Sequence, residues 1–177
     1  MENKLSKFLP LILPLLFVII TVCTMTYNAS ISKIREKEYS NDNYSIKYDT
    51  TWKVINKKEL SLEHRKSKST FNIVVKELES NYYDTKLKDI IKDIVYDVES
   101  QNEEFKLINI EENISDKYEG FSYLYEKGNE QVLVNIYKKD NKLILAYYSA
   151  SNEYFDIVLD SVDNMFNSLE IKSGLDN

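Results

Sequence analysis

Tyrosines are the main candidates for ligand-binding residues in this sequence, since 14 of them occur among 177 residues. Six of them fall in segments that we predict to be neighbouring strands: Tyr118, Tyr123, Tyr125, Tyr137, Tyr147 and Tyr148. Exposed aromatic rings can stack on sugars or peptides. The candidate ligand-binding residues are therefore Tyr123, Tyr125, Tyr137 and Tyr147. Alternating aromatic residues in a covered sheet more often form the core, so we favour core positions and keep a tyrosine-lined binding surface as the alternative.

Nucleophilic catalysis has little support in the sequence. It needs a serine or cysteine that a neighbouring base activates, and the chain holds one histidine and one cysteine. His64 lies in the charged stretch Glu63-His64-Arg65-Lys66, which predicts a solvated loop or edge position, and Cys23 lies in an apolar segment. With three glycines in the chain, a phosphate-cradling loop is not expected. We therefore predict no catalytic residue and no enzymatic activity.

Carboxylates are the remaining candidates for metal binding or acid–base chemistry. They cluster at Glu111, Glu112 and Asp116 and again at Asp156, Asp160 and Asp163. Neither cluster has the glycine-containing spacing of a calcium loop. We interpret both as solvated acidic faces and predict no metal and no cofactor. Two carboxylates about 5–10 Å apart across a cleft would instead indicate a glycoside hydrolase.

The charge of the chain argues against nucleic acid as a partner. The net charge is −6, and residues 40–177 hold 18 basic and 26 acidic residues, a net charge of −8. Phosphate backbones are bound through positive surfaces, so nucleic acid is not expected as a ligand. The single cysteine also precludes an intrachain disulfide. Export without disulfides is common among the surface proteins of Gram-positive bacteria. We therefore interpret the chain as a bacterial protein.

A segment near the N-terminus has the length and composition of a membrane span. The residues of Phe8–Met25 are almost wholly apolar, and no charged residue occurs from Phe8 to Ser32. About 20 helical residues cover the roughly 30 Å hydrocarbon layer of a bilayer. Lys4 and Lys7 precede the segment, as in an export signal. We predict a single-pass anchor in the cell membrane, with the domain on the extracytoplasmic side.

The alternatives to an uncleaved anchor are a lipoprotein and a cleaved signal. A lipoprotein would be modified at Cys23, although Val22 is larger than the residue that usually precedes such a cysteine. A cleaved signal would end near Ala29, although Tyr27 is large for the −3 position. With the anchor uncleaved, we divide the chain into an anchor (1–32), a linker (33–43), a folded domain (44–172) and a short tail (173–177).

The folded domain shows the periodicities of seven strands and two helices. Alternating apolar residues predict strands around 44–48, 52–55, 71–75, 105–110, 121–125, 132–137 and 143–148. Spacings of three and four predict amphipathic helices over 87–98 and 155–169. The candidate N-caps are Asp84 or Thr85 for the first helix and Ser151 or Asn152 for the second. Gly128–Asn129 and Asp140–Asn141 mark hairpin turns.

These elements predict an α+β fold. The order β-β-β-α-β-β-β-β-α, with hairpins between successive strands, indicates a largely antiparallel sheet. Several strands are apolar on both faces, so each face needs a covering layer. We therefore expect an α/β/α sandwich with two helices over the sheet, plus one N-terminal transmembrane helix.

Several residues resemble the PsbP-like family, which is named for an extrinsic accessory protein of photosystem II. That family opens with an aromatic strand and a Tyr/Phe-Pro-x-x-Trp turn. Here the strand from Tyr44 to Tyr48 leads through Asp49 to Trp52, so that aspartate stands in place of the proline. A glycine before an aromatic strand (Gly120) and a terminal helix that ends at Ser168–Leu169 also match, although leucine replaces the usual phenylalanine. The resemblance covers residues 40–172.

The resemblance implies an α/β/α sandwich, a buried Trp52 and a non-enzymatic accessory role, while a fold alone carries no ligand with it. We accordingly expect a membrane-tethered, extracytoplasmic accessory domain that binds a protein or a cell-envelope component. The alternative is an exported protein that binds a glycan or small ligand on its tyrosine-lined surface.

Overall fold

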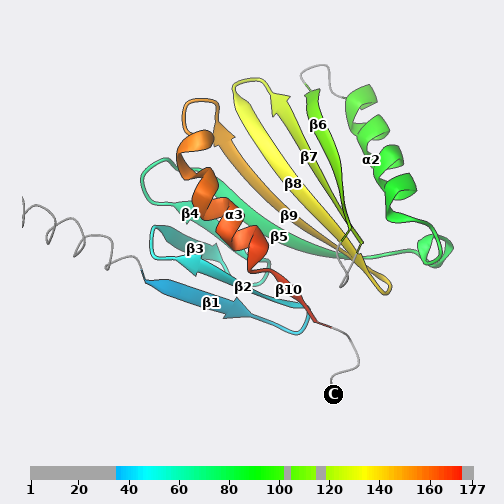
Figure 1. Ribbon diagram of the computed structural model, residues 1–177, viewed down its shortest axis with the longest axis horizontal. Helices are drawn as coiled ribbons and strands as arrows, with labels where there is room; N and C mark the ends of the chain where they lie inside the picture. Colours follow the sequence, from blue (N-terminus) through cyan, green and yellow to red (C-terminus); the bar gives the residue numbers. More distant parts are fainter. Residues whose placement is uncertain (1–34, 102–104, 115–118, 173–177) are drawn as a thin grey trace, which may run out of the picture. The chain divides into compact units, whose positions relative to one another are not determined.

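The computed structural model describes residues 35–101, 105–114 and 119–172 (Figure 1). Apart from Arg35, they belong to a unit that spans Glu36–Asn177. Several positions that the sequence analysis singled out lie outside the described residues: the anchor Phe8–Met25 with Cys23, Ala29, Asp116, Tyr118 and the tail 173–177. Among the described residues, no helix is long and apolar enough to cross a membrane.

Seven antiparallel strands form the main sheet. Their spatial order is β3 (Trp52–Asn56), β4 (Ser61–His64), β5 (Thr70–Glu77), β9 (Lys142–Ser151), β8 (Glu130–Lys139), β7 (Glu119–Lys127) and β6 (Phe105–Ile114). Two meanders, β3–β5 and β6–β9, join where β5 pairs with β9. The hairpin turns predicted after β7 and β8 are confirmed, because Gly128 and Asp140 adopt the positive φ angles of 59° and 54° that such turns need.

A second, three-stranded sheet contains strands that the sequence analysis did not predict. It has the order β1 (Glu36–Ser40), β2 (Tyr44–Asp49) and β10 (Glu170–Ile171), all antiparallel. Strand β1 lies within the segment interpreted as a linker, and its side chains are mostly exposed. A strand that buries neither face shows no hydrophobic alternation, so its sequence resembles a linker.

The two long helices pack on opposite faces of the main sheet. Helix α2 (Leu87–Gln101) packs against one face, and α3 (Leu159–Asn167), which follows the short helix η2 (Asp156–Val158), packs against the other. Alternate residues of β9 show this division, since Ile144, Ala146 and Tyr148 belong to the α3-side core and Leu143 to the α2-side core. The helices and their apolar stripes are confirmed, and the fold is α+β.

The α3-side core is the larger of the two and also includes the small sheet. Its fully buried side chains are large: Tyr44, Ile46, Trp52, Leu60, Leu62, Phe71, Ile73, Ile144 and Tyr148. Helix α3 adds Val162, Met165 and Phe166. The Phe71 and Phe166 ring centroids lie 5.2 Å apart, which joins helix and sheet directly.

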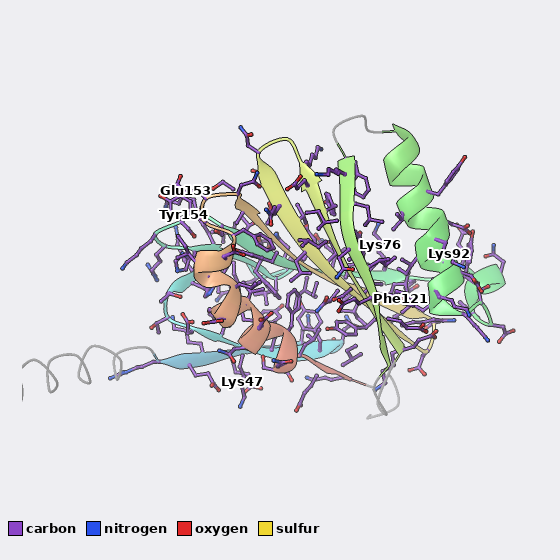
Figure 2. The ribbon with its side chains drawn as sticks, turned by 45° about the horizontal axis from the view of Figure 1, so that its top comes forward. Lys47, Lys76, Lys92, Phe121, Glu153 and Tyr154 are labelled. Atoms are coloured by element: carbon purple, nitrogen blue, oxygen red, sulfur yellow. The ribbon has the colours of Figure 1, made fainter. Side chains whose placement is uncertain are left out.

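Helix α2 covers only part of its face of the sheet. It packs over β6 and β7, where Phe121 is buried against it while Lys92 points away from the sheet (Figure 2). Farther along the same face, Asn72 and Val74 of β5 and Tyr147 of β9 are only half-buried. This part of the sheet is therefore accessible.

The start of α2 differs from its predicted cap. The backbone N–H of Leu87 donates to Glu119 Oε1 of β7 at 3.2 Å, and the hydroxyl of Thr85 donates to the Asn81 carbonyl instead. A carboxylate at a helix N-terminus satisfies an unpaired N–H and the helix dipole. Here that carboxylate lies 32 residues away, so local sequence gives no sign of it.

Candidate functional site

Three of the four candidate tyrosines share one face of the main sheet. Tyr123 and Tyr125 alternate on β7, and Tyr147 of β9 lies in register with Tyr123 across Val134 of β8. The Tyr123 and Tyr125 ring centroids are 5.9 Å apart in a stacked arrangement. The ring of Phe105 lies 4.6 Å from that of Tyr125. These rings form an aromatic row on the α2 side of the sheet.

Tyr137 is the candidate that the structure separates from the others. It lies on β8 in register with Gly120 and Ile144, and it packs against the α3-side core. Asn135 Nδ2 donates to its hydroxyl at 3.3 Å. Successive side chains of a strand point to opposite faces. Tyr137 lies three positions after Val134, the β8 residue in register with Tyr147, so it cannot line the same surface as Tyr147.

Burial controls the chemistry of the aromatic row. It raises the pKa of Tyr123 to about 12, with a further contribution from Tyr125. Burial also raises the pKa of Tyr125, with smaller contributions from Tyr147 and Glu130. These phenols stay protonated at neutral pH, so they can donate and accept hydrogen bonds but do not act as bases or nucleophiles. The row suits binding rather than catalysis.

A hollow of about 290 Å³ adjoins the aromatic row on the accessible part of the sheet. Tyr147 and Val74 line it from the sheet, and Ile55, Asn56 and Glu59 line it from β3 and the β3–β4 connection. Ile55 is 51% exposed. We call Ile55, Val74 and Tyr147 the open-face patch. The sequence gives no sign of its aliphatic members, because nothing in it shows that α2 stops short of them.

His64 is not the solvated residue that its charged neighbours predicted; that expectation was wrong. The side chain is 8% exposed, because alternate residues of β4 point inward and bring its ring within 5.3 Å of the Trp52 ring centroid. His64 Nδ1 accepts a hydrogen bond from the backbone N–H of Ser67 at 3.2 Å, and the Ser67 hydroxyl lies 2.7 Å from the same nitrogen. The imidazole stabilises a turn.

The stability of the domain should fall on acidification because of His64. Burial lowers the pKa of His64, opposed by Asp49 and assisted by Lys66. Below about pH 6.5 the unfolded chain therefore takes up a proton that the folded chain resists, so the free energy of unfolding decreases as the pH falls. Urea denaturation between about pH 8 and pH 5 measures this slope. His64→Asn, which keeps an acceptor and removes the titration, should flatten it, and an unchanged slope would contradict the assignment.

The carboxylates do not gather around the aromatic row. Asp160 and Asp163 lie on the exposed side of α3. The limited burial of the Asp163 carboxyl and the negative charge of Asp160 raise the pKa of Asp163. Glu111 and Glu112 are exposed on β6. Within residues 35–101, 105–114 and 119–172, no three His, Cys, Asp or Glu side chains are placed to hold a metal ion.

Comparison with known proteins identifies the fold. No protein-family model matches the chain, and no curated protein matches it in sequence. Among solved structures, cyanobacterial PsbP from Synechocystis matches with a TM-score of 0.62 and 18% identity, over 77% of this chain and 92% of that chain. The described domain has a PsbP-like fold.

Two further structures share this PsbP-like fold at lower identity. LpqN of Mycobacterium tuberculosis, described as involved in cell envelope biogenesis, matches with a TM-score of 0.58 and 7% identity over 79% of this chain and 92% of that one. The Ran-binding protein Mog1p of Saccharomyces cerevisiae matches with a TM-score of 0.54 and 7% identity over 78% and 96%. Identities this low establish the fold alone.

Trp52 occupies the buried position that the resemblance implied. Its side chain is 0% exposed, and its indole N–H donates to Ser161 Oγ of α3 at 2.9 Å. The Ser161 hydroxyl in turn donates to Asp49 Oδ2 at 2.7 Å. In this PsbP-like domain the tryptophan therefore connects the start of β3 to α3 through packing and a hydrogen bond.

Proposed function

We propose that this chain is a membrane-tethered, extracytoplasmic protein whose PsbP-like domain is a non-catalytic interaction module for a protein or another component of the cell envelope. The observation that supports it is the open-face patch. Its aliphatic and aromatic side chains remain accessible beside the aromatic row, on a sheet face that α2 covers chiefly over β6 and β7. Accessible apolar residues grouped in a hollow are typical of binding surfaces.

The related folds agree with an accessory role without specifying the partner. Mog1p is described as a Ran-binding protein, so one protein with this fold binds another protein. LpqN is described as involved in cell envelope biogenesis, which is the compartment that the apolar segment Phe8–Met25 suggests for this chain. Both points serve here as support for the proposal.

A glycan or small polar ligand is the second candidate occupant of the same surface. The hollow combines the Tyr147 ring with the polar side chains of Asn56, Glu59 and Asn72. Sugars are bound by an aromatic ring that contacts their C–H face and by polar groups that contact their hydroxyls. This combination favours a neutral sugar over a charged ligand, because Glu59 is the one charged residue among those that line the hollow.

The location is testable by protease protection. Protease added to intact spheroplasts should remove the chain beyond Lys33, because the proposal places that part outside the membrane. Immunoblots against an N-terminal tag and against the domain read out the cleavage. Full protection of the domain would contradict the proposed topology. Mass spectra that show a lipid-modified N-terminus at Cys23 would mean that the chain is anchored by a lipid and not by a helix.

The role of the open-face patch is testable with matched isoleucine variants. Ile55→Glu places a charge in the patch, whereas Ile157→Glu places one at a residue of η2 that is 68% exposed. The full-length protein is purified from its native membrane by affinity, with mass spectrometry of bound proteins and a parallel sedimentation assay on purified cell wall. We expect Ile55→Glu to reduce the specific partner or the wall-bound fraction about 10-fold or more and Ile157→Glu to leave it unchanged. Equal binding by both variants would exclude the patch as the binding surface.

A further inference from the structure

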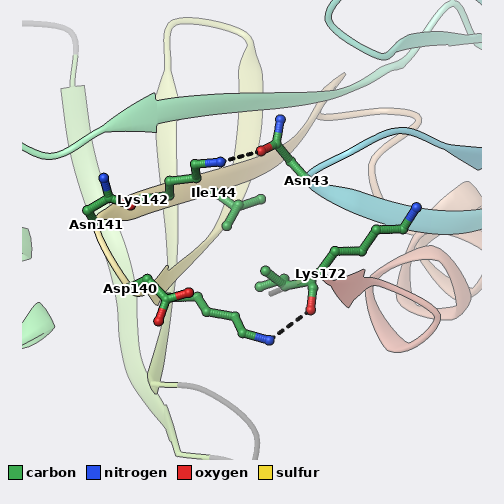
Figure 3. Close-up of a pocket in the computed structure, with 8 residues that line it drawn as sticks. Asn43, Asp140, Asn141, Lys142, Ile144 and Lys172 are labelled. Carbon is green, nitrogen blue, oxygen red and sulfur yellow. Dashed lines mark hydrogen bonds between the residues drawn. The ribbon is translucent and has the colours of Figure 1, made fainter. Parts of the chain in front are cut away.

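A second hollow, of about 280 Å³, lies at the opposite end of β9 from the β9–η2 connection and is basic (Figure 3). Lys139 and Lys142 flank the Asp140–Asn141 turn of the β8–β9 hairpin, and Lys172 follows β10. The apolar side chains of Ile144 and Ile171 also line it, together with Asn43. The chain as a whole is acidic, with a net charge of −6, so a hollow lined by three lysines differs in charge from the rest of the molecule.

Hydrogen bonds hold the three ammonium groups in place. Lys142 Nζ donates to Asn43 Oδ1 at 2.7 Å (Figure 3), and Lys139 Nζ donates to the Ile171 carbonyl at 3.0 Å. Lys172 Nζ donates to Ser40 Oγ at 2.8 Å and to the Asn41 carbonyl at 2.6 Å. All these acceptors are neutral. The side chains are therefore positioned before any ligand arrives, which reduces the entropy lost on binding.

Within the part of the chain that the structure describes, the three ammonium groups have N–H donors that are not used and positive charges that no carboxylate neutralises. Each has three N–H donors, and the bonds above use one on Lys139, one on Lys142 and two on Lys172. None of the three forms an ion pair with a carboxylate of the described residues. The carboxylate of Asp140 also lines the hollow, so the formal charge of the lining residues is +2, with the Lys172 ammonium directed to Ser40 and Asn41, which lie outside the lining. A dianion with several acceptor oxygens would neutralise that charge.

The backbone around the hollow is also fixed. The N–H of Leu78 donates to the Asn141 carbonyl at 2.8 Å, and the N–H of Lys172 donates to the Asn43 carbonyl at 2.9 Å. These bonds tie the β8–β9 turn to the end of β5 and β10 to the β1–β2 turn. The hollow is thus built from segments far apart in the sequence, and only the stretch Lys138-Lys139-Asp140-Asn141-Lys142 gives a local sign of it.

We propose that this hollow, between the β8–β9 turn and β10, binds a phosphate dianion, either inorganic phosphate or the phosphate of a monoester. A phosphate carries a charge between about −1.5 and −2 at pH 7 and offers at least three acceptor oxygens. That negative charge matches the excess positive charge of the residues that line the hollow. The phosphate oxygens can accept hydrogen bonds from the unused N–H groups of Lys139 and Lys142. The site is distinct from the open-face patch, which Ile55 and Tyr147 line, so its failure would leave the proposed function untouched.

Isothermal titration calorimetry of the full chain in nonionic detergent tests the site, with sodium phosphate and glycerol 3-phosphate as separate titrants. We expect saturable binding with a Kd of about 1 mM for at least one of them, and the tighter titrant identifies the source as free phosphate or monoester. Lys139→Gln with Lys142→Gln should weaken binding about 10-fold or more. Lys53→Gln with Lys76→Gln removes the same charge from two exposed residues of β3 and β5 and should change it little.

A second variant tests the site without removing any of the lysine hydrogen bonds. Asp140→Asn removes the one carboxylate of the lining, and asparagine tolerates the positive φ of this turn position. The variant should bind phosphate several-fold more tightly, because the repulsion between carboxylate and ligand is gone. Each of three results would overturn the proposal. The first is the absence of saturable binding up to about 20 mM of either titrant. The others are equal phosphate affinity of the two double variants and no increase in phosphate affinity for Asp140→Asn.

Discussion

Replacing Trp52 by alanine is expected to lower the free energy of unfolding by about 3–5 kcal/mol. The side chain is 0% exposed and contacts two other rings, His64 with centroids 5.3 Å apart and Tyr148 at 6.4 Å in an edge-on arrangement. Truncation leaves a cavity between β3 and α3 and removes the donor to Ser161 Oγ. Urea denaturation followed by circular dichroism at neutral pH measures the change.

Trp52→Phe separates the packing of this residue from its hydrogen bond. Phenylalanine fills most of the volume but has no N–H, so the loss should stay near 1–2 kcal/mol, close to the value of one buried hydrogen bond plus a small cavity. A decrease in the free energy of unfolding below about 1 kcal/mol for Trp52→Ala would contradict the role of Trp52 as a core residue. Removing a fully buried indole side chain destabilises a protein by more than that.

Elements that bury one or two apolar faces were predictable from the sequence, and elements that bury neither were not. The stripe of α2 and the alternation of β5, β7, β8 and β9 appear in the structure where the periodicity placed them. Strand β1 exposes most of its side chains, and β10 has two residues, so neither leaves a periodic signal. Strand β4 was missed although it buries Leu62 and His64, because it has four residues and only one of these two inward residues is apolar. Its register with β5 comes from tertiary pairing.

The candidate site was predictable only in part, for a similar reason. Alternation within one strand places Tyr123 and Tyr125 on the same face, but the relation of Tyr147 to them depends on the register across β8. A shift of one residue in that register would have brought Tyr137 to this face instead. Accessibility of the open-face patch depends on how far α2 extends over the sheet, which is a property of helix packing rather than of any local pattern.

The aspartate that stands where PsbP-like sequences carry proline leads to a second large effect. Asp49 Oδ1 accepts from the backbone N–H of Thr51 at 2.7 Å and from the hydroxyl of Thr51, which forms an Asx-type turn. Its other oxygen accepts from Ser161 Oγ. A proline would fix the turn by restricting φ, whereas here a carboxylate fixes it by hydrogen bonds and also joins it to α3.

Asp49→Ala is therefore expected to lower the free energy of unfolding by about 2–3 kcal/mol, because three half-buried donors lose their acceptor at once. Asp49→Asn keeps one acceptor oxygen for the Thr51 N–H and should lose about 1 kcal/mol. A double-mutant cycle of Asp49→Ala with Ser161→Ala isolates the link to α3, for which we expect a coupling energy of about 1 kcal/mol. Additive losses in that cycle would show that the turn and the helix are stabilised independently. The aspartate would then replace the proline only as a local turn residue, and the connection from β3 to α3 would rest on the Trp52 indole alone.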